Sequence, residues 1–230
     1  NEKLSSIVYK MQEFLIHIAK PDGTVPSVGD SFDDNVMRIS KGIITNEYLL
    51  FEITNGAEGV EIENRSIVYT DAGIAIFKND WVNDKPIYFS LFNAYHSSVH
   101  KQSDDLSFVL TYGETDFFVD AGKYNFVEDD PYRIFIRSVF AHNTISVDNK
   151  TYDFREQSFI GNPTIDDYSI GLDFSYVKAS HRLFEGVEIT RTAFFFNEGA
   201  VYIHDSIKSD VSHSYSQIFN VGQDVILDTN

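Results

Sequence analysis

The chain has 230 residues, of which 43% are hydrophobic, so it can bury a sizeable core in one large domain. Its formal net charge is −17, and this acidic field argues against nucleic-acid binding and requires a local cationic or metal-bearing pocket for any anionic substrate. Cysteine is absent, which excludes disulfides and thiolate metal sites, and no apolar run approaches the roughly 18 residues of a membrane span.

The N-terminal segment predicts a single amphipathic helix. From Leu4 to Ile18 apolar residues recur at three- and four-residue spacing, and the sequence KPDG then ends the helix. Its apolar face requires a partner surface, so we expect self-association through this helix. The polar connection PDGTVPSVGDSFDDN predicts a domain boundary, with residues 1–38 as one unit and residues 39–230 as the other. Because the chain begins at NEKLSSIVYK without Met, we expect it to be a piece of a longer protein.

The rest of the chain predicts strands. Short runs rich in Ile, Val, Phe, Tyr and Thr alternate with turn residues, and the 20 Phe and 13 Tyr favour strands over helices. Because strands do not alternate with helices, the pattern predicts a mainly β fold, a large antiparallel β-sandwich preceded by the one helix. The predicted strands lie in EYLLFEIT, SIVYTDAGIAIFKN, PIYFSLFNAY, LSFVLTYG, DFFVDAG, NTISVDN, VEITRTAFFFN and AVYIHDSI.

Polar residues are concentrated in AYHSSVHKQSDDLSFVL, residues 94–110, directly before an apolar run. If a strand begins near His100, its period of two places His100, Gln102 and Asp104 on one face at the mouth of the core. His96 is interpreted as lining the same cleft. The alternative is that His100 is a hydrogen-bonded surface residue at a strand end.

Two further residues extend this candidate site. Asp120 ends the apolar run of FFVDAG, and His142 directly precedes the strand-like run NTISV. A turn-capping role is the alternative for Asp120. An imidazole, a carboxylate and an amide oxygen form an acceptable shell for a divalent cation, so we expect Zn²⁺ or Ca²⁺ at Gln102, Asp120 and His142.

A family resemblance covers the segment from about His96 to Asp153. In order, HKQSDDLSF, FFVDAGKY and YRIFIRSVFAHNTISVDNKTYD resemble the signature of the heparinase II/III family of polysaccharide lyases. PDGTVPSVGDS resembles the link that follows the helical toroid of that family, and HRLFEGVEITRTAFFF resembles its later strands. In the family an α/α toroid packs on an antiparallel β-sandwich, with the active site between them. The resemblance implies that the helix of residues 4–18 is the last toroid helix.

The resemblance also implies roles for individual residues. His100 matches the sandwich-side catalytic histidine, whereas Asp120 and His142 match metal ligands. Family members carry either His or Gln at the position of Gln102. A further group resembles substrate-side residues, the alternative being strand-surface residues that balance an acidic protein: Tyr132, Arg133 and Arg137.

The implied reaction is β-elimination from a uronic acid in an acidic polysaccharide. A base removes the C5 proton, a neutralising group stabilises the sugar carboxylate, and an acid protonates the departing O4. Because the partner Tyr and the neutralising Asn or His of the family lie largely on the toroid, we expect the isolated chain to be inactive. A bacterial periplasmic or secreted location is expected. A C5 uronate epimerase and a noncatalytic glycan-binding or surface-assembly domain are the alternatives.

Overall fold

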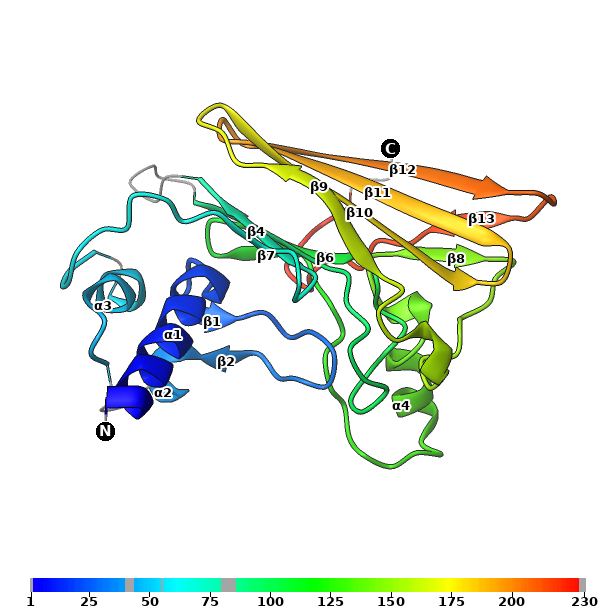
Figure 1. The fold of residues 1–230 in the computed structure, drawn as a ribbon, viewed down its shortest axis with the longest axis horizontal. Coiled ribbons are helices and arrows are strands. Elements are labelled where there is room, and N and C mark those ends of the chain that lie inside the picture. The colour runs from blue at the N-terminus through cyan, green and yellow to red at the C-terminus, as the bar shows by residue number, and fades with distance from the viewer. Residues whose placement is uncertain (1, 40–43, 55, 80–85, 228–230) are drawn as a thin grey trace.

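The protein is described by a computed structural model that covers residues 2–39, 44–54, 56–79 and 86–227. Two large antiparallel sheets pack face to face, and helices lie beneath one of them (Figure 1). The prediction of a mainly β sandwich preceded by one amphipathic helix is therefore confirmed. Within the described ranges, no helix combines the length and the apolar character that crossing a membrane requires.

Consecutive strands are neighbours in both large sheets. One sheet has the order β3 (Ile67–Tyr69), β4 (Ile74–Lys78), β5 (Ile87–Phe92), β6 (Ser107–Tyr112) and β7 (Thr115–Phe118). The other has the order β12 (Ala200–Ser209), β11 (Val187–Phe196), β10 (Phe174–Phe184) and β9 (Thr164–Ser169). Two small pairs complete the strands, β1 (Thr24–Val25) with β2 (Asp34–Asn35), and β8 (Ile145–Val147) with β13 (Tyr215–Gln217).

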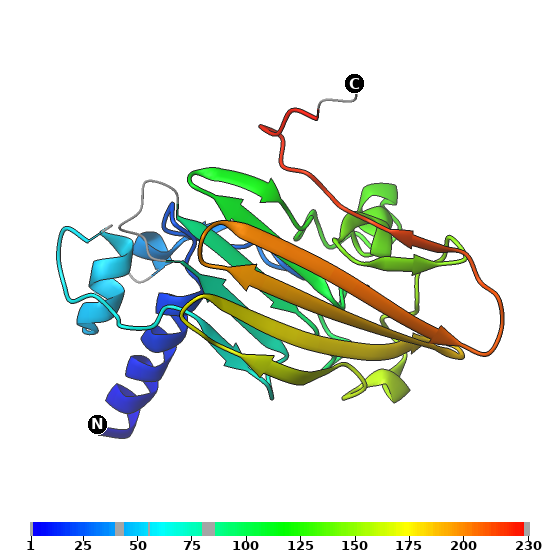
Figure 2. The ribbon, with the colours of Figure 1, turned by 90° about the horizontal axis from the view of Figure 1, so that it is seen from above.

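The main core lies between the two large sheets, one of which lies over the other in Figure 2. Phe89 on β5 stacks on Phe77 and Phe108 with ring centroids 6.1 and 5.6 Å apart, and Phe77 lies 6.0 Å from Phe195 of the opposite sheet. Strands β10 and β11 alternate strictly between buried and more exposed residues, because only one of their faces meets the core. Strands β4 and β5 are buried nearly throughout, which indicates that both of their faces are covered.

Helix α1 (Glu2–Ile18) covers the second face of the five-stranded sheet with its C-terminal end. Ile18 packs on Ile76, Tyr88 and Val109, and the Lys78 ammonium donates to the Ile16 carbonyl at 2.8 Å. The N-terminal half of the same apolar face remains uncovered and projects from the body in Figure 2, leaving these large residues exposed: Leu4, Ile7 and Met11.

One predicted strand is a helix. EYLLFEIT forms α3 (Glu47–Ile53), because the Asn46 side chain caps it by accepting from the backbone of Tyr48 and Leu49. The short α2 (Val36–Ile39) precedes it, and Leu49 joins Ile16 and Val36 in a small helical core. That core contains residues from both sides of the predicted boundary at residues 38 and 39, and the domain division stays a prediction.

The segment that contains Tyr132 and Arg133 is also helical, not a strand surface. It forms α4 (Pro131–Ile136), with the Asp130 carboxylate accepting from the backbone N–H groups of Tyr132 and Arg133. Pro131 suits the first turn because the missing N–H has no helical partner there. Two 3₁₀ turns follow, η1 (Val139–Ala141) and η2 (Gln157–Phe159). Helix α4 lies below the sheets in Figure 1.

Candidate active site

His100 lies in the connection between β5 and β6. Residues 100–106 form an irregular loop and not a strand. The backbone of His100 and Leu106 has left-handed φ values of 60° and 64°, which a regular strand cannot contain. The expectation that His100, Gln102 and Asp104 share one strand face is therefore wrong, since β6 starts only after this loop. The positive φ of a histidine is uncommon and marks a backbone that its surroundings hold in place.

The carboxylate of Asp30 brings three of the predicted site residues together. Asp30 lies between β1 and β2, and its side chain is only 4% exposed. Its Oδ2 is 3.1 Å from His100 Nδ1, and its Oδ1 accepts from Gln102 Nε2 at 3.0 Å. The guanidinium of Arg133, on α4, donates to the two carboxylate oxygens at 2.5 and 2.8 Å. One buried carboxylate thus connects the linker after α1, the 100–106 loop and α4.

This environment fixes the charge of Asp30 and the orientation of His100. Burial opposes ionisation of Asp30, but hydrogen bonds from Arg133, Gln102 and His100 outweigh it and lower the pKa of Asp30 to about 2. A carboxylate only accepts, so a neutral His100 imidazole donates its Nδ1 proton to Asp30 and keeps a lone pair on Nε2. The His100 side chain is 63% exposed. The site therefore presents an oriented imidazole that can take up or give a proton at Nε2.

Asp120 and His142 form a second, fully buried pair at the end of β7 and after η1. His142 Nδ1 lies 2.8 Å from Asp120 Oδ2, which also accepts from Ser107 Oγ at 3.0 Å. Burial disfavours the charged imidazole, but the Asp120 carboxylate more than offsets this, so the pKa of His142 is raised. The structure brings these two predicted metal residues into contact.

Gln102 is connected to Asp120 through the backbone of Gly122. The Gln102 amide donates to the Gly122 carbonyl at 3.0 Å, and the Gly122 N–H donates to Asp120 Oδ1 at 3.1 Å. Gly122 has a φ of +58°, and a Cβ there would lie 1.9 Å from Ser27 Oγ, so only glycine fits this turn. The three predicted metal residues are therefore grouped around one glycine turn that packs on the linker.

The donor set partly fits a metal ion. His142 Nε2 and Gln102 Oε1 are buried and have no hydrogen-bond partner among the described residues, which is the state expected of atoms that bind an absent ligand. The described part of the chain gathers no three His, Cys, Asp or Glu side chains that could hold a metal, so an ion here would need the Gln102 amide as its third ligand. Zinc or calcium at these residues stays a prediction.

The predicted substrate-side residues divide into buried and exposed ones. Arg133 is 2% exposed and bound to Asp30, whereas Arg137 is 8% exposed and pairs with Glu128 at 2.8 Å. These ion pairs give both arginines a part in holding the site together, and direct substrate contact by them stays a prediction. Tyr132 is exposed, and its ring lies 5.7 Å from that of Tyr124.

His96 contacts a residue that lines a small pocket next to His100 but does not line that pocket itself. Its Nε2 is 3.3 Å from the carbonyl oxygen of Ala72. Ala72 and His100 line the same pocket, which has a volume of about 170 Å³ and also includes Lys101 and Asp104. The structure therefore places His96 near the candidate cleft, and substrate binding by His96 stays a prediction.

Buried polar groups support the 100–106 loop from below. Lys101 pairs with Asp105 at 2.9 Å, and the hydroxyl of Tyr152 donates to the same carboxylate at 2.6 Å. From β11, Arg191 donates to the Leu106 carbonyl at 2.7 Å and to the Asn143 carbonyl next to His142. The loop that carries His100 is therefore anchored to both sheets.

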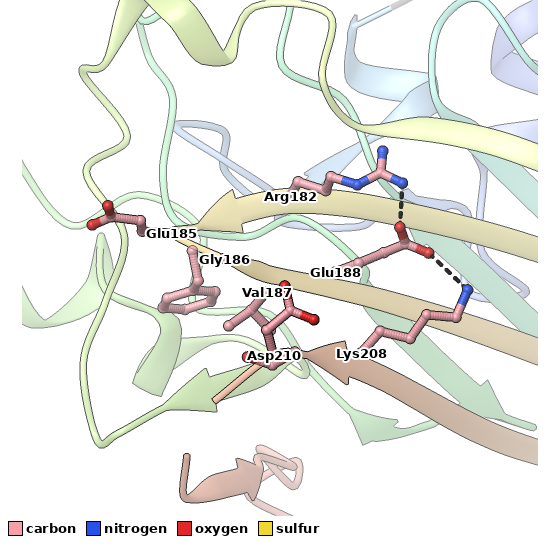
Figure 3. A pocket seen from close by; sticks show the side chains of 9 residues that line it. Arg182, Glu185, Gly186, Val187, Glu188, Lys208 and Asp210 are labelled. Carbon is pink, nitrogen blue, oxygen red and sulfur yellow. Dashed lines mark hydrogen bonds and ion pairs between the residues drawn. The ribbon is translucent and has the colours of Figure 1, made fainter. Parts of the chain in front are cut away.

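Two other pockets among the described residues contain none of the predicted site residues. A pocket at the β10–β11 turn is shown in Figure 3, where Arg182 and Lys208 both pair with Glu188. A larger pocket of about 740 Å³ is lined by residues of the 61–66 loop and of β4 and contains none of the predicted site residues. The candidate active site is therefore identified by the chemistry of its side chains and not by the size of a pocket.

Sequence reasoning missed Asp30. It lies in PDGTVPSVGDS, which was interpreted as a linker, so its carboxylate received no role. The available signal was an acid between Gly29 and Ser31 in the one linker segment that resembles the family. The 70-residue separation between Asp30 and His100 hides their contact from any local pattern.

Comparisons with known proteins identify the family of the chain. The chain is 26% identical over 159 residues to a heparin-sulfate lyase of Bacteroides stercoris, a match that covers 65% of this chain and 24% of the relative. A heparinase III, the BT4657 gene product, superposes with a TM-score of 0.86 at 19% identity over 100% of this chain and 36% of its own. The heparan sulfate lyase HepC of Pedobacter heparinus gives a TM-score of 0.84 at 19% identity, covering 97% and 36% of the two chains.

The chain thus spans about a quarter of the curated relative and about a third of the solved structures. At such low identity, the structural likeness concerns the fold. The family described as Heparinase II/III-like, C-terminal, matches residues 62–230, which include the motifs from His96 to Asp153. This match takes in most of the chain and confirms the resemblance seen in the sequence. The chain belongs to the heparinase II/III-like family of polysaccharide lyases.

Proposed function

We propose that this chain supplies the β-sandwich half of the active site of a lyase that cuts a uronic-acid-containing polysaccharide by β-elimination. The observation that carries the proposal is the exposed His100 imidazole, whose Nδ1 is held 3.1 Å from the buried, ionised carboxylate of Asp30. The names of the relatives make heparin and heparan sulfate the first substrates to test.

In this mechanism His100 moves the proton at Nε2. The neutral imidazole keeps its Nδ1 proton in a hydrogen bond to Asp30 and accepts a second proton at Nε2. The Asp30 carboxylate then stabilises the positive charge of the imidazolium. In the elimination, the C5–H bond of the uronic acid breaks, its electron pair forms the C4–C5 double bond, and the C4–O4 bond breaks. The departing O4 takes up a proton. His100 Nε2 acts at one of these two proton transfers, and a group of the toroid half acts at the other.

Asp30 is a positioning residue in this mechanism. It accepts from His100 Nδ1, and it is itself fixed by the bidentate pair with Arg133 on α4. Imidazole orientation by a carboxylate on the nonreacting nitrogen is a recurring way to fix the tautomer of a catalytic histidine. Arg133 therefore contributes through Asp30, two contacts away from the reacting atoms.

A divalent cation, if bound, would be held by His142, Asp120 and Gln102. It would supply positive charge next to the cleft and link the end of β7 to the loop of His100. Without it, Asp120 already fixes His142 at 2.8 Å, and no step of the proposed proton transfer depends on the ion.

The test is product analysis with the full-length protein on heparin, heparan sulfate and other uronic-acid polysaccharides. A lyase yields shorter chains with unsaturated, ultraviolet-absorbing ends. An epimerase leaves chain length unchanged and incorporates solvent deuterium at C5, and a noncatalytic glycan-binding domain does neither. Absence of unsaturated ends across the panel overturns the lyase proposal. Because intact polysaccharides do not cross membranes, we also propose a periplasmic or secreted location, to be tested by cell fractionation.

A further inference from the structure

Most cations around His100 are already neutralised by carboxylates. Arg133 binds Asp30 through two hydrogen bonds, and Arg137 binds Glu128 at 2.8 Å. Lys101, which follows His100, is buried between Asp104 and Asp105. In each of these three cations the positive charge is already paired with a carboxylate. A further cation near His100 without a carboxylate partner would favour binding of a polyanion to this chain of net charge −17.

Lys123 is a cation near His100 that contacts aromatic rings and has no carboxylate partner among the described residues. Its ammonium lies 4.0 Å from the ring centroid of Phe126 and 4.4 Å from that of Phe32, so it is held between two aromatic rings. Across the described ranges of the chain, Lys123 forms no ion pair. Its backbone N–H donates to the Ser31 carbonyl at 3.0 Å, which anchors the residue directly after the Gly122 turn. An ammonium has three donors, and aromatic faces satisfy none of them as strongly as an anion does.

Phe126 connects Lys123 to the proposed catalytic histidine. The Phe126 ring lies 6.0 Å from the His100 ring in an edge-on contact, while Lys123 contacts the same phenyl group. Phe126 and Phe32 are each 57% exposed. Exposed rings with a fixed cation suit a sugar that presents C–H groups on one face and an anionic substituent at its edge.

We propose that Lys123, held between Phe32 and Phe126, is a subsite for an anionic group of the polysaccharide, a carboxylate or a sulfate, next to His100. The inference rests on the proposed function and deepens it. Lys123 forms the charge contact, and Phe126 provides the surface on which the sugar lies. Matched substrates with and without sulfate distinguish whether the bound group is a carboxylate or a sulfate.

The experiment uses the full-length protein with Lys123→Met, which keeps the length of the side chain, and Lys123→Arg, which keeps the charge. Lys178→Met is the matched control, because Lys178 is an exposed lysine on the four-stranded sheet, on β10. We expect Lys123→Met to raise KM about tenfold or more while kcat changes less than about threefold, as expected for loss of one ionic binding contact. Lys123→Arg should recover most of the loss, and Lys178→Met should leave KM unchanged.

Substrates with and without sulfate identify the anion. An increase in KM on both indicates the uronic carboxylate, and an increase confined to sulfated chains indicates sulfate. Equal KM values for parent and Lys123→Met on every cleaved substrate overturn the subsite. In parallel, the affinities of the parent and of Lys123→Met for heparin and for desulfated heparin are measured at low salt. A parent protein that binds but does not cleave refutes the proposed function, and the affinity ratio of parent to Lys123→Met then decides the subsite. A parent that neither binds nor cleaves overturns both.

Discussion

The buried carboxylate of Asp30 makes the sharpest prediction about the site. In Asp30→Asn the shape is kept, but an NH₂ group replaces one of two oxygens that together accept from Arg133, Gln102 and His100. Arg133, which is 2% exposed, loses its counterion, and removing one partner of a buried ion pair costs about 3–5 kcal/mol. His100 simultaneously loses the anion that fixes its tautomer, so we expect kcat to fall by about 10²- to 10⁴-fold.

A double substitution separates these two effects. In the full-length protein, kcat on a cleaved polysaccharide and the midpoint of thermal unfolding are measured for Asp30→Asn and for Asp30→Asn combined with Arg133→Met. Because the second change removes the unpaired buried charge, the double variant should recover much of the lost stability. Its kcat should remain low, since His100 still lacks a carboxylate. A folded Asp30→Asn protein with kcat close to the parent value refutes the proposed role of Asp30.

Three further predictions concern the metal, acid stability and α1. Elemental analysis of the purified protein should find Zn²⁺ or Ca²⁺, and His142→Ala should lose it; a metal-free parent contradicts the expected site. Because the pKa of Asp30 is lowered from 3.8 to about 2, its contribution is fully present above about pH 4 and lost as pH falls toward 2. After allowance for solvent screening, this pH-dependent part is about 1–2 kcal/mol. It is measured by denaturant unfolding as the change, between pH 6 and pH 2.5, in the stability difference between parent and Asp30→Asn. The 230-residue chain should self-associate in light scattering through the exposed face of α1, and Met11→Glu with Leu4→Glu should weaken this; a monomeric parent chain argues against it.

The sandwich could be predicted because its physical signals are local. Runs such as VEITRTAFFFN alternate between core and surface residues, and the turn residues between the runs are frequent enough to mark hairpins. The sequential hairpins then give both large sheets their order. The largely apolar β5, interrupted only by Ser90, carried a further signal, since such a run indicates burial on both faces. Only the structure shows that α1 covers the second face.

The geometry of the site could be predicted only in part. Asp120 and His142 follow and precede recognisable strands, so their proximity was expected, and they lie 2.8 Å apart. The backbone conformation of the His100 loop could not be predicted from hydrophobic periodicity, because its two left-handed residues depend on tertiary contacts and not on local propensity. α3 was mistaken for a strand because seven residues are too few to distinguish the two periods, although the Asn46 cap was a usable signal. Asp30 was hidden by its distance along the chain.

The central claim, that His100 moves a proton in a lyase reaction, is tested most directly by His100→Asn in the full-length protein. Asn is chosen because it tolerates the φ of 60° at this position better than Ala does. Unsaturated product formation and thermal unfolding are measured on the same preparations. The His100 side chain is 63% exposed, so its removal should change the unfolding midpoint little. We predict a loss of at least about 10² in product formation with an unchanged midpoint. Product formation near the parent level by a folded His100→Asn protein, on a substrate that the parent cleaves, would contradict the account.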